Sequence, residues 1–157
     1  MELSPADKFW NDFLVSTNRD SEDRCAGDIN FESKGFSNDV QISMILSGAK
    51  TAVFTSFASY AIDGEPLPVT GELYMVFDRS DNPRAIIQLE SVNIVPFNEV
   101  TWLMASQDGE DSNLDEWKSK MQENLELEGS IVGFDFTPDM KLVYQTFSVV
   151  YKYLFYC

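Results

Sequence analysis

The residues with the clearest chemical potential are a lysine and the small side chains around it. Lys50 follows Gly48 in "LSGAKT" (46–51), where an amphipathic run ends and a run rich in threonine and valine begins. A lysine held at such a helix-to-strand corner, and partly removed from water, can bind an anion or take part in proton transfer. A lysine just after a helix can also simply complement the negative end of the helix dipole. Taken alone, these residues favour the structural role.

An acidic segment, "QDGEDS" (107–112), supplies candidate partners for this lysine. It contains Asp108, Glu110 and Asp111. The simpler interpretation is a solvated loop in which Asp111 or Ser112 caps the next helix. If one carboxylate instead reached the lysine, the pair could orient a water or hydroxyl group and stabilise charge that develops during a reaction.

Hydroxyl and aromatic side chains follow the lysine along the chain. Thr51 and Thr55 carry hydroxyl groups that could act as nucleophiles beside a lysine or carboxylate base. Phe57 and Tyr60 could stack on a planar ligand. The structural alternative for these side chains is an ordinary place in a strand and its core.

The composition excludes several kinds of catalytic and metal site. The chain has no histidine, which removes serine–histidine and cysteine–histidine catalysis and every zinc site that needs histidine. Two cysteines, Cys25 and Cys157, are too few for a zinc site made only of cysteines. No loop has the spacing of a calcium-binding hand. We therefore expect neither a metal nor another cofactor.

A formal net charge of −15 restricts the partners that the protein can bind. Such a surface repels a phosphate backbone at long range, so we expect no binding to long duplex nucleic acid. A local basic pocket could still hold one nucleotide or a short segment of nucleic acid, and an acidic surface could also meet a basic protein partner. The simplest role of the charge is to keep the protein soluble. The sequence predicts no oligomeric state.

The hydrophobic pattern predicts a protein that is not embedded in a membrane. Every apolar run is far shorter than the ~20 residues that a membrane-spanning helix needs. The amino terminus has neither the basic start nor the small-residue cleavage site of a secretory signal. We therefore expect a cytoplasmic protein.

The elements that must position these residues follow from periodicity and from turn and capping residues. We predict helices over 5–16, 38–47 (capped by Ser37) and 113–127, a short helix within 97–106, and strands over 51–60, 72–78, 84–97 (bent near Glu90) and 140–156. Within 113–127 one helix face is an apolar stripe that we assign to the core, made of Leu114, Trp117, Met121 and Leu125. This order of helices and strands indicates an α+β fold, a small and partly closed barrel of mixed or antiparallel strands with helices packed over its ends. Residues 1–157 are predicted to form one domain, with 1–35 as an N-terminal helix and arm.

Several short segments, in this order, resemble the ASCH domain family, a group of PUA-like barrels. The resemblance covers nearly the whole chain, although no single motif is highly specific. It is carried by "ILSGAKTA" (45–52), "GEPLPVTGE" (64–72), "PRAIIQLESVNIVPFNEV" (83–100), "GEDSNLDEW" (109–117) and "FTPDMKLVYQTFSVVY" (136–151). It implies a PUA-like barrel with a cleft near the Gly48–Lys50 corner that accepts RNA or a modified nucleoside.

The resemblance also implies which residues matter. Some small members of the family are amidohydrolases of acylated cytidine, and others have been assigned ribonuclease activity. In the amidohydrolase pattern a lysine, a threonine three residues later and a glutamate in the loop before a helix are catalytic, and the lysine and glutamate map onto Lys50 and Glu110. Val53 stands where the threonine should be, so catalysis would need Thr51, Thr55 or a water as the nucleophile. We therefore expect ligand binding at Lys50 and Glu110, with hydrolysis or a pure protein-interaction role as alternatives.

Overall fold

The computed structural model describes residues 3–19, 25–29, 38–78 and 80–152. Its helices are α1 (Pro5–Ser16), α2 (Asn38–Ser47), α3 (Phe57–Asp63), the 3-10 helix η1 (Phe97–Glu99), α4 (Trp102–Ser106) and α5 (Leu114–Val132), and its strands are β1 (Gly27–Ile29), β2 (Ala52–Ser56), β3 (Leu73–Phe77), β4 (Pro83–Pro96) and β5 (Lys141–Lys152). None of the helices within these ranges is long and apolar enough to cross a bilayer.

The five strands form one curled sheet in the order β1-β3-β4-β5-β2. β1 runs parallel to β3, and all other neighbours are antiparallel. The long strands β4 and β5 pair along most of their length and form a two-stranded ribbon. β3 pairs with β4 at one end of this ribbon, and β2 pairs with β5 at the other end. The register of β4 against β5 shifts between Leu89 and Ser91. This bulge confirms the bend predicted near Glu90, and the sheet confirms the α+β, barrel-like class.

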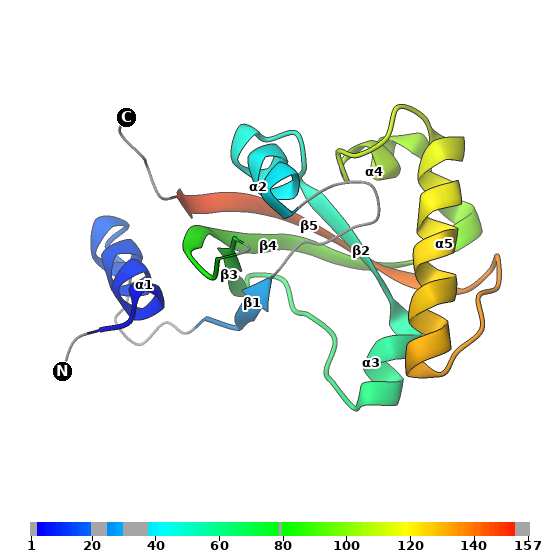
Figure 1. Cartoon of the computed structure of the whole chain (residues 1–157), viewed down its shortest axis with the longest axis horizontal. Coiled ribbons are helices and arrows are strands. Elements are labelled where there is room, and N and C mark those ends of the chain that lie inside the picture. Colours follow the sequence, from blue (N-terminus) through cyan, green and yellow to red (C-terminus); the bar gives the residue numbers. More distant parts are fainter. Residues whose placement is uncertain (1–2, 20–24, 30–37, 79, 153–157) are drawn as a thin grey trace.

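The longest helix, α5, packs against one end of the sheet (Figure 1). Asn113 caps it by accepting a hydrogen bond from the Glu116 main-chain N–H at 2.8 Å. The predicted apolar stripe is confirmed, because Trp117 and Leu125 are fully buried, and the partly buried Leu114 and Met121 pack beside them. The burial of this stripe therefore fixes α5 and the loop before it against the sheet.

Two other helices cover the far end of the sheet from its two sides. Ile42 and Ile45 of α2 pack with Ile87 of β4. The neighbouring Ile86 belongs instead to the cluster formed by Phe13 and other aromatic side chains of α1. Figure 1 shows α1 and α5 at opposite ends of the fold.

Several predicted boundaries were wrong. The strand predicted over 51–60 ends at Ser56, and α3 follows directly and ends at Gly64, whose φ of 70° is left-handed. The arm predicted before residue 36 contains β1, and its residues 20–24 and 30–35 lie outside the described residues. Asn113, rather than Asp111 or Ser112, is the cap of α5, and that helix continues to Val132. The strand predicted over 140–156 is β5, and residues 153–157 are not among those described.

Candidate functional site

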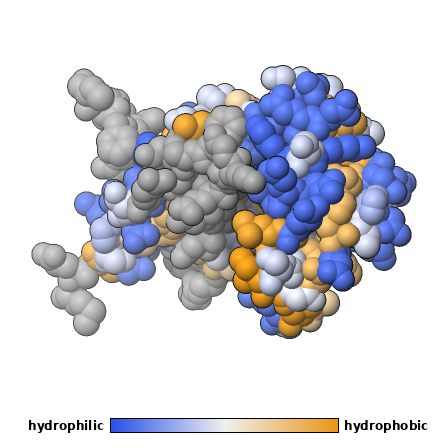
Figure 2. Space-filling view, turned by 45° about the vertical axis from the view of Figure 1, so that its right-hand side comes forward, coloured by the Kyte–Doolittle hydropathy of each residue, from blue (hydrophilic) through white to orange (hydrophobic). Residues whose placement is uncertain are grey.

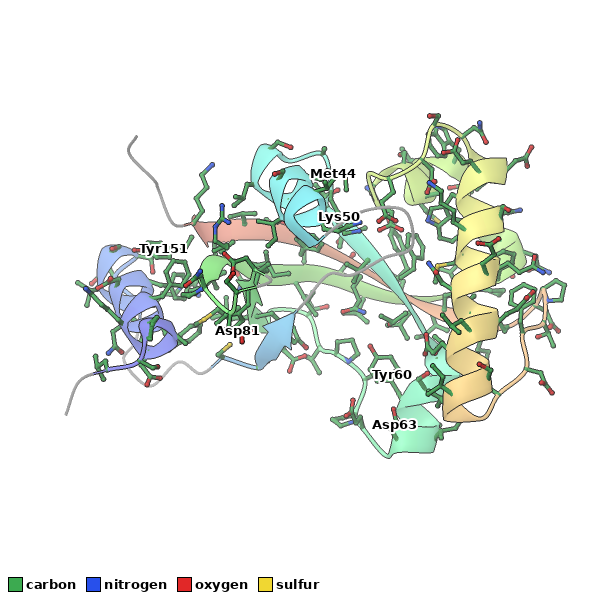
Figure 3. All side chains as sticks on the ribbon, viewed as in Figure 1. Met44, Lys50, Tyr60, Asp63, Asp81 and Tyr151 are labelled. Atoms are coloured by element: carbon green, nitrogen blue, oxygen red, sulfur yellow. The ribbon has the colours of Figure 1, made fainter. Side chains whose placement is uncertain are left out.

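A cleft of about 1280 Å³ lies beside β2, the edge strand of the sheet. Its walls come from the α2–β2 corner, from α3 and the segment 65–74, from the loop 108–110 and from the inner face of α5. Figure 3 shows Lys50 where β2 begins and Tyr60 on α3, which follows the other end of that strand. The predicted residues therefore surround a hollow that extends along β2.

Lys50 is held at the cleft wall by the way α2 ends. Gly48 adopts a left-handed φ of 85°, and the Lys50 main-chain N–H donates to the Met44 carbonyl at 3.0 Å. The lysine is 4% exposed, and its ammonium group donates to the main-chain carbonyl of Asp108 at 3.0 Å and forms an ion pair with the Asp108 carboxylate. The helix end thus aims the ammonium group at the acidic loop.

Asp108 is fixed from a second side. Its Oδ2 atom accepts a hydrogen bond of 3.0 Å from the indole Nε1–H of Trp117, the buried anchor of α5. The carboxylate therefore joins the lysine to the helix. Trp117 is a residue of the site that the sequence analysis assigned only to the core.

The acidic loop is docked tightly against the α2–β2 corner. The Gln107 carbonyl accepts hydrogen bonds from the Thr51 and Ala52 main-chain N–H groups at 2.8 and 3.1 Å. Gly109 has a φ of 84°, and a Cβ atom there would lie 2.9 Å from the Ala49 carbonyl oxygen. Only glycine fits this approach without a shift of the backbone.

Glu110 and Lys50 line the same cleft. The Glu110 carboxylate accepts a hydrogen bond from the side-chain amide of Gln41, on α2. The sequence left open whether a carboxylate of this loop reaches Lys50, with Glu110 as the candidate from the resemblance; the ion pair is formed by Asp108, two residues before Glu110. Both carboxylates therefore belong to the site, in different positions.

Two separate sets of hydrogen bonds also involve residues that line the cleft. The Thr55 hydroxyl lies 3.0 Å from the Tyr60 hydroxyl and accepts from the Gln145 amide at 3.2 Å. Tyr74 donates to the Glu72 carboxylate at 3.1 Å. Burial, the hydrogen bond to Glu72 and the charge of that carboxylate raise the pKa of Tyr74 far above its ordinary value, so this phenol stays neutral.

The remaining predicted residues lie around the cleft rather than in its lining. Gly48, Thr51 and Phe57 are not among the lining residues, and the Phe57 ring faces the Lys141 ammonium group at 5.7 Å from its centroid. Val53, at the position of the missing threonine, does line the cleft. Asp111 forms an ion pair with Lys120 at 2.8 Å.

The charge of the cleft is negative. Its described lining contains one lysine and five carboxylates, a formal excess of four negative charges; the carboxylates are Glu65, Glu72, Asp108, Glu110 and Glu128. Its lining also includes exposed apolar side chains such as Leu67 and Leu127. Figure 2 shows hydrophobic side chains gathered in the lower part of the face it presents. Within the described ranges, no three His, Cys, Asp or Glu side chains are grouped so as to hold a metal ion.

Comparisons with known proteins agree with this architecture. The family model of the ASCH domain matches residues 28–151. The crystal structure of an ASCH domain from Lactobacillus crispatus JV V101 is similar, with a TM-score of 0.85, 27% identity and coverage of 94% of each chain. A crystal structure of a protein from Enterococcus faecalis V583 has a TM-score of 0.81 and 28% identity, covering 92% of this chain and 87% of that one. No curated protein matches the sequence significantly.

Proposed function

The chain belongs to the ASCH domain family, and from this premise and the geometry of the cleft we propose that it binds an uncharged, nucleoside-sized heterocyclic ligand. The proposal rests on one observation, a cleft of about 1280 Å³ that Lys50 and Glu110 both line. The fold itself does not identify a ligand. The class of ligand is inferred instead from the side chains that line the cleft.

The lining matches a ligand that is planar and polar at its edges. Glu110 offers an acceptor, Thr55 and Tyr60 offer hydroxyl groups, and Gln145 offers an amide. Leu67 and Leu127 offer apolar surface to a ring face. Ligand sites commonly combine such apolar walls with a few polar groups that set orientation.

The charge of the cleft favours a nucleoside over an RNA. Four excess negative charges face the ligand, and the whole chain carries −15. A phosphate group would meet this field with repulsion that is strongest at low ionic strength. We therefore expect nucleosides to bind better than their monophosphates, and short RNA to bind least.

Isothermal titration calorimetry with a panel of probes tests the proposal. The probes are uridine, cytidine, N4-acetylcytidine, their 5′-monophosphates and a short single-stranded RNA. We expect the nucleosides to bind and Glu110→Gln to weaken the best of them by roughly tenfold, because a hydrogen bond to a charged acceptor is lost. Glu126→Gln, on the exposed part of α5 and outside the cleft lining, is the matched control and should change nothing. Absence of binding to every nucleoside, or tighter binding of the monophosphates, would overturn the proposal.

Hydrolysis of an amide or phosphodiester is the second candidate function. It is favoured by the presence of Lys50, Glu110 and the Thr55 hydroxyl in one cleft. Glu110 would act as general base rather than Lys50, whose ammonium group is ion-paired with Asp108, and a water or a threonine hydroxyl would be the nucleophile. The valine at position 53 is the observation against it, and its replacement is the test considered in the Discussion.

A further inference from the structure

The outer edge of β2 carries main-chain groups that the sheet does not use. Among the strands that the structure describes, β2 is the last of the sheet and pairs only with β5. The Phe147 N–H donates to the Thr51 carbonyl at 2.9 Å. This bond shows which main-chain groups of β2 point towards β5. Because the hydrogen-bonding direction alternates along an antiparallel strand, Val53 and Thr55 bond to β5. The main-chain groups of Ala52, Phe54 and Ser56 point away from it.

One contact at the start of β2 is compatible with this direction. The Ala52 N–H donates to the Gln107 carbonyl, which lies outside the sheet, at 3.1 Å, and the same carbonyl accepts from the N–H of Thr51, the residue before the strand, at 2.8 Å. That carbonyl closes one end of the free edge, and α3, which starts at Phe57, closes the other. Phe54 is the residue between them, and no other described segment hydrogen-bonds to its main chain.

The free edge opens into the cleft. Val53, Phe54 and Thr55 all line it, although successive side chains of a strand point to opposite faces. Three consecutive residues can line one hollow when that hollow passes along the edge of the strand. The Phe54 N–H and C=O therefore face the space that we assign to the ligand.

We propose that the Phe54 main chain is the recognition site for the ligand's hydrogen-bonding edge. Its N–H donates to an acceptor of the ligand, and its C=O accepts from an adjacent N–H. The complementary ligand is a heterocycle with an amide-like edge, such as the N3–H and carbonyl of a uracil ring or the amino group and N3 of a cytosine ring. This inference rests on the proposed function and names the part of the ligand that is read.

The same edge could in principle pair with an extended peptide, as free strand edges often do. The open stretch, however, is limited to Phe54 by the Gln107 carbonyl and by α3. One residue supplies only two hydrogen bonds, which suits a small ring better than a peptide strand. A peptide is therefore an outcome of the test rather than the proposal.

Amide hydrogen exchange measured by NMR on the full chain tests this inference. The probes are uridine, cytidine, 3-methyluridine, N4,N4-dimethylcytidine and a blocked alanine dipeptide. With a saturating parent nucleoside, exchange at the Phe54 amide should slow by at least about tenfold, because opening must then break the ligand contact. The Val53 and Thr55 amides, which already bond to β5, should change by less than about twofold. The methylated analogue of that nucleoside should bind at least about tenfold more weakly, since it lacks the donor.

The outcomes separate the two proposals. A nucleoside that binds without slowing exchange at Phe54, or a methylated analogue that binds equally well, overturns the recognition by Phe54 and leaves the proposed function standing. If only the blocked dipeptide slowed exchange at the Phe54 amide, the edge would pair with peptides. The proposal that Phe54 binds a heterocycle would then be overturned. Binding of no probe at all would overturn both.

Discussion

Lys50 and Asp108 form an ion pair that is almost completely removed from solvent, with side-chain exposures of 4% and 12%. The Trp117 indole donates to the other oxygen of the same carboxylate. Taking two charges out of water is costly, and their mutual attraction offsets this only while both partners are present. The pair therefore fixes the geometry of the corner more than it adds net stability.

Breaking this pair from one side should destabilise the fold strongly. Lys50→Met and Asp108→Leu should each lower the free energy of unfolding by about 3–5 kcal/mol, because each leaves a buried charge without its partner. In the double variant the free energy of unfolding should fall by about 1–3 kcal/mol, far less than the sum of the two single losses. Most of this loss comes from the Trp117 indole N–H, which no longer has an acceptor. Urea denaturation of the four proteins measures these differences. Additive losses would show that the two charges do not interact in the folded protein.

The contact between Gly109 and the lysine corner predicts a second effect. Gly109→Ala should destabilise the protein, because alanine is strained at a φ of 84° and its Cβ would lie 2.9 Å from the Ala49 carbonyl oxygen. Relief of this contact must move the acidic loop away from the corner. We therefore expect weaker nucleoside binding together with a lower melting temperature.

Gly64→Ala is the matched control for this variant. Gly64 has a similar φ of 70°, but a Cβ there meets nothing within 4 Å. Its substitution should cost only the backbone strain, about 1–2 kcal/mol, and leave nucleoside affinity unchanged. Equal effects of both substitutions on stability and on binding would contradict a specific role for the docked loop.

Local sequence signals predicted most of the helices and long strands, because periodicity and capping act over a few residues. The stripe of Trp117 and Leu125 and the glycine that ends α2 are of this kind. The end of β2 was missed because Phe57 and Tyr60, just beyond it, are aromatic residues of the kind that favour strands. The left-handed Gly64 that ends α3 was the local signal for a helix there.

Non-local pairing limited what the sequence could show. β1 has three residues in a polar segment, and it exists because of its parallel pairing with β3. Lys50 pairs with Asp108 rather than with Glu110, and this likewise depends on a non-local contact. The Gln107 carbonyl accepts hydrogen bonds from the start of β2 and so sets the position of the acidic loop. Neither relationship leaves a pattern in neighbouring residues. The region of the site could be predicted, whereas its hydrogen bonds could not.

The turn between β3 and β4 predicts a pH-dependent contribution to stability. Burial alone would raise the pKa of Asp78, but the Asn82 and Ser80 N–H groups, each at 2.9 Å, and the nearby Arg84 guanidinium lower the pKa below its ordinary value. The unfolded chain then binds protons more tightly at this group. The ionised carboxylate therefore contributes stability that is fully present above the unfolded pKa of about 3.9 and is lost as pH falls through the lower pKa of the folded state.

Asp78→Asn should remove this contribution. At pH 7 we expect a loss of roughly 1 kcal/mol, because the hydrogen bonds to a charged acceptor become hydrogen bonds to a neutral one. The difference from the unmodified protein should shrink as pH falls through the lowered pKa of the folded state, below which the carboxyl group is protonated in both states. Urea denaturation across this range measures it, with Asp139→Asn, an exposed site, as the control. A difference that stays constant with pH would contradict the role of the ionised carboxylate.

Val53 predicts that the native chain binds an acylated nucleoside without hydrolysing it. Valine offers no hydroxyl at a position that lines the cleft with Lys50 and Glu110. Val53→Thr would place a hydroxyl there at a cost in stability of about 1 kcal/mol, since part of the side chain faces the cleft. We expect this variant to release cytidine from N4-acetylcytidine, measured by chromatography, and Glu110→Gln in the same background to abolish the release.

Val53→Ala is the control, because it changes the volume at this position without adding a hydroxyl. It should bind the acylated nucleoside and remain inactive. Turnover by the native chain that Thr55→Ala removes would show that a neighbouring hydroxyl already fills the role. If the Val53→Thr variant bound the nucleoside but remained inactive, the missing hydroxyl would not be the only reason why the native chain does not hydrolyse it. In that case Lys50 and Glu110 serve binding alone.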